Sequence, residues 1–398
     1  MLASRDGVIP YPRIIRPFGA TMPFRILVLG GYGLFGGRIC RALNDERELW
    51  IGVAGRDAGR ARSFVDSMPP GAATLEAIAL DHEAVDFGER VSALRPRLIV
   101  HAAGPFQGQS YHVAHAAIAA GAHYVDLADG REFVNGIGKL GVDARTRGLV
   151  VASGASTLPA VSTAVIERLA DGLVALHGID ISIAPAQSIP RGKATLAGVL
   201  SYCGKPFLER VDGAWRRVYG WQGLHRIHYP DIGARLAARC DVPDLDLLPE
   251  RYPKLLTVRF DAALELGLAQ WGMWALAWLV RIGIVRSPER LAGFLLCTAR
   301  ILDRFGSDVG GMHVGIEGER VDGRSVRRTW YLVARQGDGP QIPCVPATVI
   351  TRKLARGVTI APGARPCVGM MTLGEFEIAL RDYDITWRIE EHRLRQSP

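Results

Sequence analysis

Short apolar runs recur through residues 24–153, and an amphipathic segment follows each of them. The runs read FRILVLG, ELWIGVAGR, ATLEAIALD, PRLIVHAAG, HYVDLA and LVVASG. The segment LFGGRICRALN shows the helical spacing, because Phe35, Ile39 and Leu43 fall on one face. Regular alternation of strands and helices predicts an α/β fold built on a Rossmann-type, doubly wound parallel sheet with right-handed crossovers.

The alternation stops near residue 175, and longer strand-like runs replace it. GIDISIAPA and GAWRRVYGW read as strands, and MHVGIEGERVDGRSVRRTWYLVARQG reads as a hairpin whose turn is Asp322-Gly323. Helical spacing resumes near residue 345 and gives way to a final strand-like run. This middle part therefore predicts an inserted α+β domain with an antiparallel sheet.

Two apolar segments stand out within residues 262–304. LGLAQWGMWALAWLV carries Trp271, Trp274 and Trp278, and LAGFLLCTARIL follows it. Each segment is shorter than the roughly 20 residues that a bilayer-spanning helix needs. We expect a pair of buried helices covering a sheet, since buried helices are commonly apolar all round. The alternative is an interfacial hairpin, or a lid over an apolar substrate.

Composition and charge indicate which classes of protein and ligand fit this sequence. The chain has 398 residues, 48% of them apolar and 22% charged, which is typical of a globular protein. The net charge of +8 is scattered along the chain, so no basic stripe indicates a nucleic-acid partner, and the excess favours small anionic ligands. Six cysteines without a C-x-x-C pair predict reduced thiols, no metal site and a cytoplasmic protein, with membrane association as a variant.

A glycine cluster follows the first predicted strand directly and opens a predicted helix. Gly31, Gly33 and Gly36 form G-x-G-x-x-G, a pattern in which glycines allow a tight turn, close approach of a diphosphate and close packing of the helix. The helix N-terminus would add N–H groups for the phosphates. We expect Tyr32, Leu34 and Phe35 to complete this cofactor-binding turn.

The residue at the end of the second predicted strand indicates whether NAD or NADP would bind. Arg56 stands where an NAD site usually carries an acidic residue, and a guanidinium there suits the 2′-phosphate of NADP. NADP is thus the expected cofactor, and the neighbouring Asp57 leaves NAD as the alternative. Asp81, after the third strand, joins the expected cofactor-binding set. The loop after the fourth strand is expected to line the nicotinamide with four residues, Ala103, Gly104, Pro105 and Phe106.

Candidate catalytic and substrate residues lie on both sides of the expected cleft. Asp126 and Asp129 fall at the end of the fifth strand, and either carboxylate could serve as the acid or base for hydride chemistry. We prefer Asp126, because Asp129 could equally cap the next helix. Arg191 and Lys193 precede a helix and could bind a substrate anion, although an exposed basic loop would look the same. His228 is a third substrate candidate, because an imidazole can shuttle protons.

Four motifs together resemble the saccharopine dehydrogenase-like family of NAD(P)-binding Rossmann oxidoreductases. They are LGGYGLFGGRICRAL, VAGRDAGRA, HAAGPFQGQSYHVAHAAIAAGAHYVDLADG and ASGASTLPAVSTAVI. The resemblance implies hydride transfer at a C–N or related bond, and an inserted domain that covers the cleft and mediates dimer contacts. It also implies a C-terminal return to the Rossmann domain. The expected divisions are a flexible leader at 1–23, an NAD(P)-binding domain at 24–175, an α+β domain at 176–340 and the returning segment at 341–398.

These observations together predict an NADP-preferring oxidoreductase that acts on a small or partly apolar substrate. We expect a homodimer without a nucleic-acid partner. The alternative is a non-catalytic nucleotide-binding protein that the Trp-rich helices attach to a membrane surface or to a partner.

Overall fold

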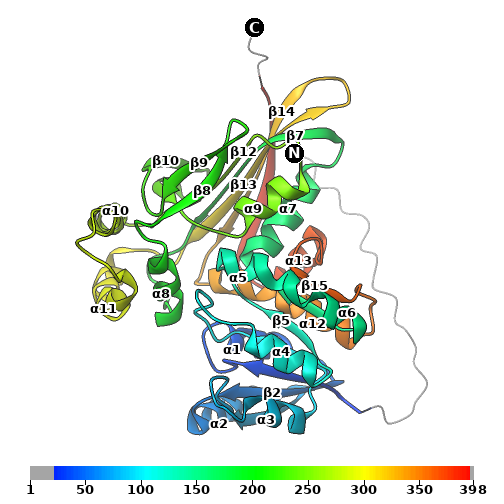
Figure 1. The fold of residues 1–398 in the computed structure, drawn as a ribbon. Helices are drawn as coiled ribbons and strands as arrows, with labels where there is room; N and C mark the ends of the chain where they lie inside the picture. The colour runs from blue at the N-terminus through cyan, green and yellow to red at the C-terminus, as the bar shows by residue number, and fades with distance from the viewer. Residues whose placement is uncertain (1–21, 395–398) are drawn as a thin grey trace.

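The computed structural model describes residues 22–394, which form two sheet-containing units (Figure 1). Most of the predicted leader, residues 1–21, lies outside this range. In the view of Figure 1 the first sheet lies below the second, and helices α12 and α13 lie between them.

The first sheet has seven strands, all parallel, in the order β15-β6-β5-β4-β1-β2-β3. The bounds are β1 Phe24–Leu29, β2 Leu49–Gly55, β3 Thr74–Ala79, β4 Leu98–His101, β5 His123–Asp126, β6 Val150–Ser153 and β15 Gly363–Pro366. All six predicted strands are present, and the doubly wound parallel fold is confirmed. The seventh strand, β15, comes from the C-terminal segment.

Helices cover both faces of this sheet. Along β1, Ile26 and Val28 belong to one buried cluster, and Leu27 and Leu29 belong to another. This double burial explains why the strands read as continuous apolar runs. The helices of this unit are α1 Gly36–Ala42, α2 Ala58–Asp66, α3 Phe87–Leu94, α4 His112–Ala119, α5 Arg131–Gly136, α6 Gly141–Thr146 and α12 Val345–Ala355, with a 3₁₀ turn at Ile137–Leu140 and a π turn at Thr157–Val161. Helix α7 Ser162–Leu169 follows β6 but packs against strands Gly310–Arg320 and Ser325–Ala334 of the second sheet.

The second sheet also has seven strands, in the order β10-β11-β12-β7-β13-β14-β16, and a separate hairpin, β8–β9, lies beside it. The bounds are β7 Leu173–Ala184, β8 Pro206–Val211, β9 Ala214–Tyr219, β10 His225–Tyr229, β11 Gly233–Arg239, β12 Thr257–Ala262, β13 Gly310–Arg320, β14 Ser325–Ala334 and β16 Ile385–Arg393. The predicted hairpin is β13–β14, and Gly323 in its turn has φ +77°. The sheet is mixed rather than antiparallel throughout, because β12 pairs parallel with β7.

The C-terminal segment divides between the two sheets. Strand β15 pairs with β6 in the first sheet, whereas β16 pairs with β14 in the second. The return to the Rossmann sheet that we expected for 341–398 therefore describes only part of this segment. The remaining helices of the chain are α8 Lys193–Ser201, α9 Asp244–Arg251, α10 Gly267–Arg281, α11 Ala292–Leu302 and α13 Leu373–Leu380, with 3₁₀ turns at Pro288–Leu291, Asp303–Phe305 and Gly339–Cys344.

The expectation of two buried apolar helices is wrong. Leu268 and Trp271 on α10 are 75% and 50% exposed, and Phe294 on α11 is 68% exposed. Within residues 22–394, no helix combines the length and the apolar character that crossing a membrane would require.

A network around Arg131 at the start of α5 joins the two units. Its guanidinium donates to Asp246 on α9 at 2.7 Å and to Asp241 at 2.8 Å, and it also reaches the carbonyl of Leu208 on β8. Asn135, one turn along α5, donates to the same Asp246 carboxylate. These charge-assisted bonds fix the second unit relative to the carboxyl edge of the first sheet.

Candidate cofactor and active site

The carboxyl ends of all seven strands of the first sheet meet at one edge, and the strand order reverses direction beside β1. In open α/β sheets a ligand binds in the crevice at this switch point. Gly30 begins the turn after β1 with φ +74°, and a Cβ there would lie 3.1 Å from the carbonyl carbon of Ala102, just after β4. The tight turn that we assigned to the first glycine of the motif, Gly31, is thus made by Gly30, one residue earlier.

Two glycines of the motif, Gly31 and Gly36, occupy places that no Cβ fits, and a Cβ at the third, Gly33, would be tight. A Cβ at Gly36 would lie 2.2 Å from the carbonyl oxygen of Gly30, and one at Gly31 would lie 2.8 Å from that of Val28. At Gly33 the distance to the Gly30 oxygen would be 3.0 Å. Helix α1 therefore begins directly against the turn, with bare backbone facing the edge of the sheet. We call this glycine turn and the helix start packed against it the cradle; the close packing presents the N-terminus of α1 at the edge of the sheet, the arrangement that suits a dinucleotide diphosphate.

The other two residues of the turn lie at the start of α1. Phe35 is the N-cap residue of the helix, and the carbonyl of Leu34 accepts a hydrogen bond from the Arg38 guanidinium at 2.6 Å. Both side chains are half-buried, so it is their backbone that borders the cradle.

Arg56 follows the last residue of β2 and is exposed. Its neighbour Asp57 caps α2 and accepts a hydrogen bond from the Arg60 amide at 2.9 Å. The Tyr32 hydroxyl accepts from the Asp57 amide at 3.1 Å, and the Arg60 guanidinium lies 5.0 Å from the Tyr32 ring. Because capping occupies a carboxylate oxygen of Asp57, the geometry favours Arg56 as the residue that would contact the ribose.

Beyond β3, the structure gathers a polar cluster that the sequence analysis missed. His82 Nδ1 lies 3.0 Å from Glu83 Oε1 and 3.4 Å from His112 Nε2, and His112 Nδ1 lies 3.0 Å from the Ser110 hydroxyl. These ligand atoms of His82, Glu83 and His112 are close enough together to hold a metal ion. The cluster escaped notice because its members come from two segments 30 residues apart.

Two observations tie that cluster to the predicted cofactor residues. Burial lowers the pKa of His82, and the charge of Arg56 contributes in the same direction, so Arg56 acts on this end of the site. The carboxylate of Asp81 accepts the amide of Glu83 at 3.2 Å, which shapes the turn that presents His82. The carboxylates of Glu83 and Asp81 act on the pKa of His82 in the opposite direction.

The loop after β4 only partly matches the prediction. Phe106 is 5% exposed, and its ring packs against His101 and Phe133 at 5.0 and 5.5 Å, so it supports the loop from below. Gln109 donates to the carbonyls of Ala103 and Pro105. Ala103, Gly104 and Pro105 remain at least partly exposed and are the part of the loop open to a ligand.

Asp126 is fully buried at the end of β5. Its Oδ1 accepts from the Gly154 amide at 2.8 Å, the Ala128 amide at 3.0 Å and the Ser153 hydroxyl at 3.0 Å, whereas Oδ2 has no hydrogen-bond partner among the described residues. Burial raises the pKa of Asp126 to about 6, although these donors and the Tyr124 hydroxyl oppose the shift. The carboxylate therefore fastens the loops after β5 and β6 and keeps one oxygen free for a proton.

Asp129 does not cap α5, because the N-cap residue is Gly130 and no side chain caps that helix. Asp129 instead accepts from the Gln107 amide nitrogen at 3.0 Å. A Cβ at Gly198, on α8, would lie only 2.9 Å from Gln107 Oε1. Helix α8 of the second unit thus touches the loop that follows β4 and forms one wall of the candidate site.

The three predicted substrate residues do not form one pocket. Arg191 is bound to Asp303 at 3.2 Å and to the Gln187 carbonyl, so the protein already satisfies its charge. Lys193 begins α8 and is exposed. His228 lines a cavity of about 450 Å³ on the second sheet, to which neither Arg191 nor Lys193 contributes.

That cavity contains a chain of hydrogen bonds that superficially resembles a nucleophilic triad. His313 Nδ1 lies 2.7 Å from the Ser182 hydroxyl, and His313 Nε2 lies 2.6 Å from Asp180 Oδ2. Ser182 is fully buried in β7 and is also bonded to the Tyr229 hydroxyl, so no substrate carbonyl can reach its oxygen. The chain joins neighbouring strands and is not a hydrolytic site.

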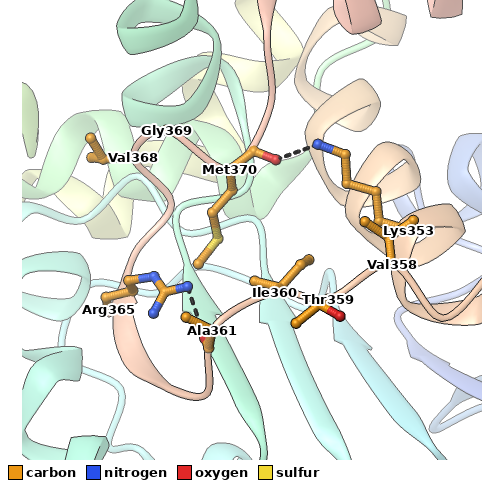
Figure 2. Close-up of a pocket in the computed structure, with 9 residues that line it drawn as sticks. All are labelled: Lys353, Val358, Thr359, Ile360, Ala361, Arg365, Val368, Gly369 and Met370. Atoms are coloured by element: carbon orange, nitrogen blue, oxygen red, sulfur yellow. Dashed lines mark hydrogen bonds between the residues drawn. The ribbon is translucent and has the colours of Figure 1, made fainter.

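Figure 2 shows a second cavity, of about 280 Å³, beside edge strand β15. Lys353 donates to the Met370 carbonyl at 2.9 Å, and Arg365 donates to the Ala361 carbonyl at 2.9 Å. Both cations are therefore occupied by the protein, and none of the predicted cofactor residues lines this cavity.

Comparison with known proteins identifies the first unit. Residues 26–166 match the family described as the saccharopine dehydrogenase NADP binding domain, a range that includes every predicted cofactor residue and Asp126. The match confirms the resemblance seen in the motifs for this part of the chain. A search of curated proteins by sequence found no match.

Solved structures extend the likeness of fold to most of the chain. The apo saccharopine dehydrogenase (L-Glu forming) from Saccharomyces cerevisiae is 15% identical with a TM-score of 0.65, covering 92% of this chain and 99% of that one. An amine dehydrogenase from Mycobacterium smegmatis is 9% identical with a TM-score of 0.45, covering 87% of this chain and 95% of that one. At these identities the yeast protein shows a shared fold and nothing further.

Proposed function

Starting from a saccharopine dehydrogenase-type NADP-binding domain at residues 26–166, we propose that this protein is an NADP-preferring oxidoreductase. Its substrate is a small or partly apolar molecule that gains or loses a hydride at a C–N or C–O bond. The observation that carries the proposal is the cradle at the switch point, where a Cβ at Gly36 would lie 2.2 Å from the Gly30 oxygen.

Each end of the cradle has residues suited to one part of NADP. The exposed guanidinium of Arg56 would pair with the 2′-phosphate, because Arg binds phosphate through two parallel hydrogen bonds. At the other end, Ala103 and Gly104 leave room for the nicotinamide ring beside Gly30. When bound, the cofactor supplies or accepts the hydride.

Reduction of an imine or carbonyl also needs a proton on nitrogen or oxygen, and the reverse reaction must remove one. Among the acidic residues at the carboxyl ends of the strands, Asp126 is best suited to hold that proton. Its pKa of about 6 lies close to neutral pH, and its Oδ2 has no hydrogen-bond partner within residues 22–394. Because Asp126 is completely buried, its proton would reach a substrate only through an intervening group or after local opening of the site.

Helix α8 supports a substrate that is partly apolar. It closes over the loop after β4 through the Gly198–Gln107 contact, and its opposite side packs against α11 of the exposed apolar pair. A substrate that enters beside α8 therefore passes apolar side chains before it reaches the cofactor loop.

The test is calorimetric titration of the protein with NADPH and NADH. We expect tighter binding of NADPH, and Arg56→Asp should weaken NADPH binding by about 10- to 100-fold, since a charge-assisted pair contributes roughly 1.5–3 kcal/mol. Arg62→Asp, an exposed change on helix α2 just after Arg56, serves as the matched control and should leave the affinity unchanged. Unchanged NADPH affinity in Arg56→Asp would contradict the assignment, and failure of the wild type to bind either cofactor at millimolar concentration would end the proposal.

A further inference from the structure

Helices α10 and α11, with the turn that joins them, form an apolar hairpin at residues 266–305. The two helices lie at the left margin of the molecule in Figure 1, outside α8 and away from the first sheet. Their inner surface is short: Gln270, Met273 and Ala277 are the buried residues of α10, and Ala292 is the buried residue of α11.

The outward face of α10 is apolar along its whole length. Its exposed side chains recur every three or four residues, which places them on one stripe. They are Leu268 at 75% exposure, Trp271 at 50%, Trp278 at 38%, Leu279 at 40% and, just past the helix, Ile282 at 61%. A stripe in this position on a helix that covers a protein core would ordinarily be charged or polar.

Helix α11 extends the same surface. Phe294 and Ile301 are 68% and 57% exposed, and Phe305 and Ile284 beyond the two helix ends are each 68% exposed. Large exposed apolar side chains concentrated on two adjacent helices mark a surface that binds something.

Positive charge surrounds this apolar surface. Residues 266–305 contain five arginines, at 281, 286, 290, 300 and 304, against two acidic residues, Glu289 and Asp303. The Asp303 carboxylate is already paired with Arg191 at 3.2 Å. The hairpin thus carries a surplus of positive charge, which complements an anionic surface.

The three tryptophans of α10 form a contiguous aromatic group. Trp274 contacts Trp271 and Trp278 edge to face, with centroids 5.3 and 6.2 Å away. The Arg281 guanidinium lies 4.8 Å from the Trp278 ring. Tryptophan and arginine side by side suit the headgroup level of a bilayer, where an apolar body and a polar tip are both satisfied.

We propose that the apolar hairpin docks this protein on the surface of an anionic lipid bilayer. Helix α10 has 15 residues, about 22 Å at 1.5 Å per residue, so it cannot cross the roughly 30 Å hydrocarbon layer and would lie in the plane of the membrane. A dimer formed through this face is disfavoured, because the excess positive charge of one copy would repel that of the other.

Helix α8 would lie between the docked hairpin and the cofactor edge. Helix α11 packs on α8, and α8 touches the loop after β4 through Gly198. The docking surface itself does not depend on the proposed function, since none of the hairpin residues belongs to the candidate cofactor site.

The test is co-sedimentation of the full chain with vesicles of phosphatidylcholine, with and without 30% phosphatidylglycerol. We expect at least tenfold tighter binding to the anionic vesicles, and weakening as salt is raised. The double variant Leu268→Glu/Phe294→Glu should lower binding at least tenfold, and Arg300→Glu/Arg304→Glu should abolish the preference for phosphatidylglycerol. Val321→Glu is the matched control, because Val321 is 83% exposed in the distant β13–β14 turn.

Each variant is also titrated with NADPH and melted, so that a folding defect is distinguished from a loss of docking. Failure of the wild type to bind either vesicle overturns the proposal, as does equal binding by the hairpin variants. If analytical ultracentrifugation shows a dimer that the same variants dissociate, without vesicle binding, the surface joins two copies instead.

Discussion

Replacing Gly36 by alanine tests the cradle with a single methyl group. The new Cβ would lie 2.2 Å from the Gly30 oxygen and 2.8 Å from the Gly30 carbonyl carbon, and both are backbone atoms. Non-bonded contacts of this kind need about 3.5 Å, so the start of α1 and the turn must separate by roughly 1 Å. Overpacking of this kind costs about 1–3 kcal/mol, and the gain from replacing a helical glycine offsets about 0.5–1 kcal/mol of it.

Gly37→Ala is the matched control one residue along α1. Its Cβ would meet the edge of the Phe64 ring at 3.1 Å, and that ring can move aside. We expect Gly36→Ala to lose about 1–2 kcal/mol in urea denaturation and to bind NADPH at least tenfold more weakly, whereas Gly37→Ala should stay within about 1 kcal/mol of wild type with unchanged affinity. Equal stability and equal NADPH affinity in the two variants would refute the close approach of α1 to the turn.

Two further predictions concern buried charge. The pKa of Asp126 is raised in the folded state from 3.8 to about 6, so its protonated form stabilises the fold and this contribution disappears as the pH rises through 6. Between pH 4 and pH 7 the free energy of unfolding of the wild type should fall by about 3 kcal/mol relative to that of Asp126→Asn, measured in parallel denaturation series. A difference between the two proteins that does not change with pH would contradict the raised pKa. Arg131→Gln should lower the free energy of unfolding by about 2–3 kcal/mol, because it removes the cation that pairs with two aspartates between the units. Arg168→Gln breaks only an exposed pair with Asp171 and should lower it by under about 1 kcal/mol. Similar losses in both arginine variants would show that the interface network contributes little.

The sequence predicted the first sheet well because its signals are local. Each strand is a continuous apolar run followed by its own helix, and the glycine motif lies within a few residues of β1. Even there, the left-handed turn residue is Gly30, because two adjacent glycines allow the motif to be placed one residue off. Phe106 was expected in contact with ligand for a similar reason, since a loop sequence does not reveal which side chain turns inward.

Contacts between segments far apart in the chain could not be predicted from the sequence. Gln107, Asp129 and Gly198 meet only because α8 lies over the loop after β4, and His82 meets His112 across the ends of β3 and β4. The strand-like character of β16 was recognised, but pairing with β14 depends on tertiary structure. Apolar composition likewise could not tell whether α10 is buried or exposed, because both states favour the same residues.

The strand order of the first sheet has a consequence for how the chain is made. Edge strand β15 is contributed by residues 363–366, more than 200 positions after its neighbour β6, so a ribosome must synthesise nearly the whole polypeptide before that edge is covered. Until then the backbone of β6 offers unpaired N–H and C=O groups to any other extended segment. A shortened gene product that stops before residue 363 would leave this edge permanently open and prone to aggregation, even with every glycine of the G-x-G-x-x-G motif intact.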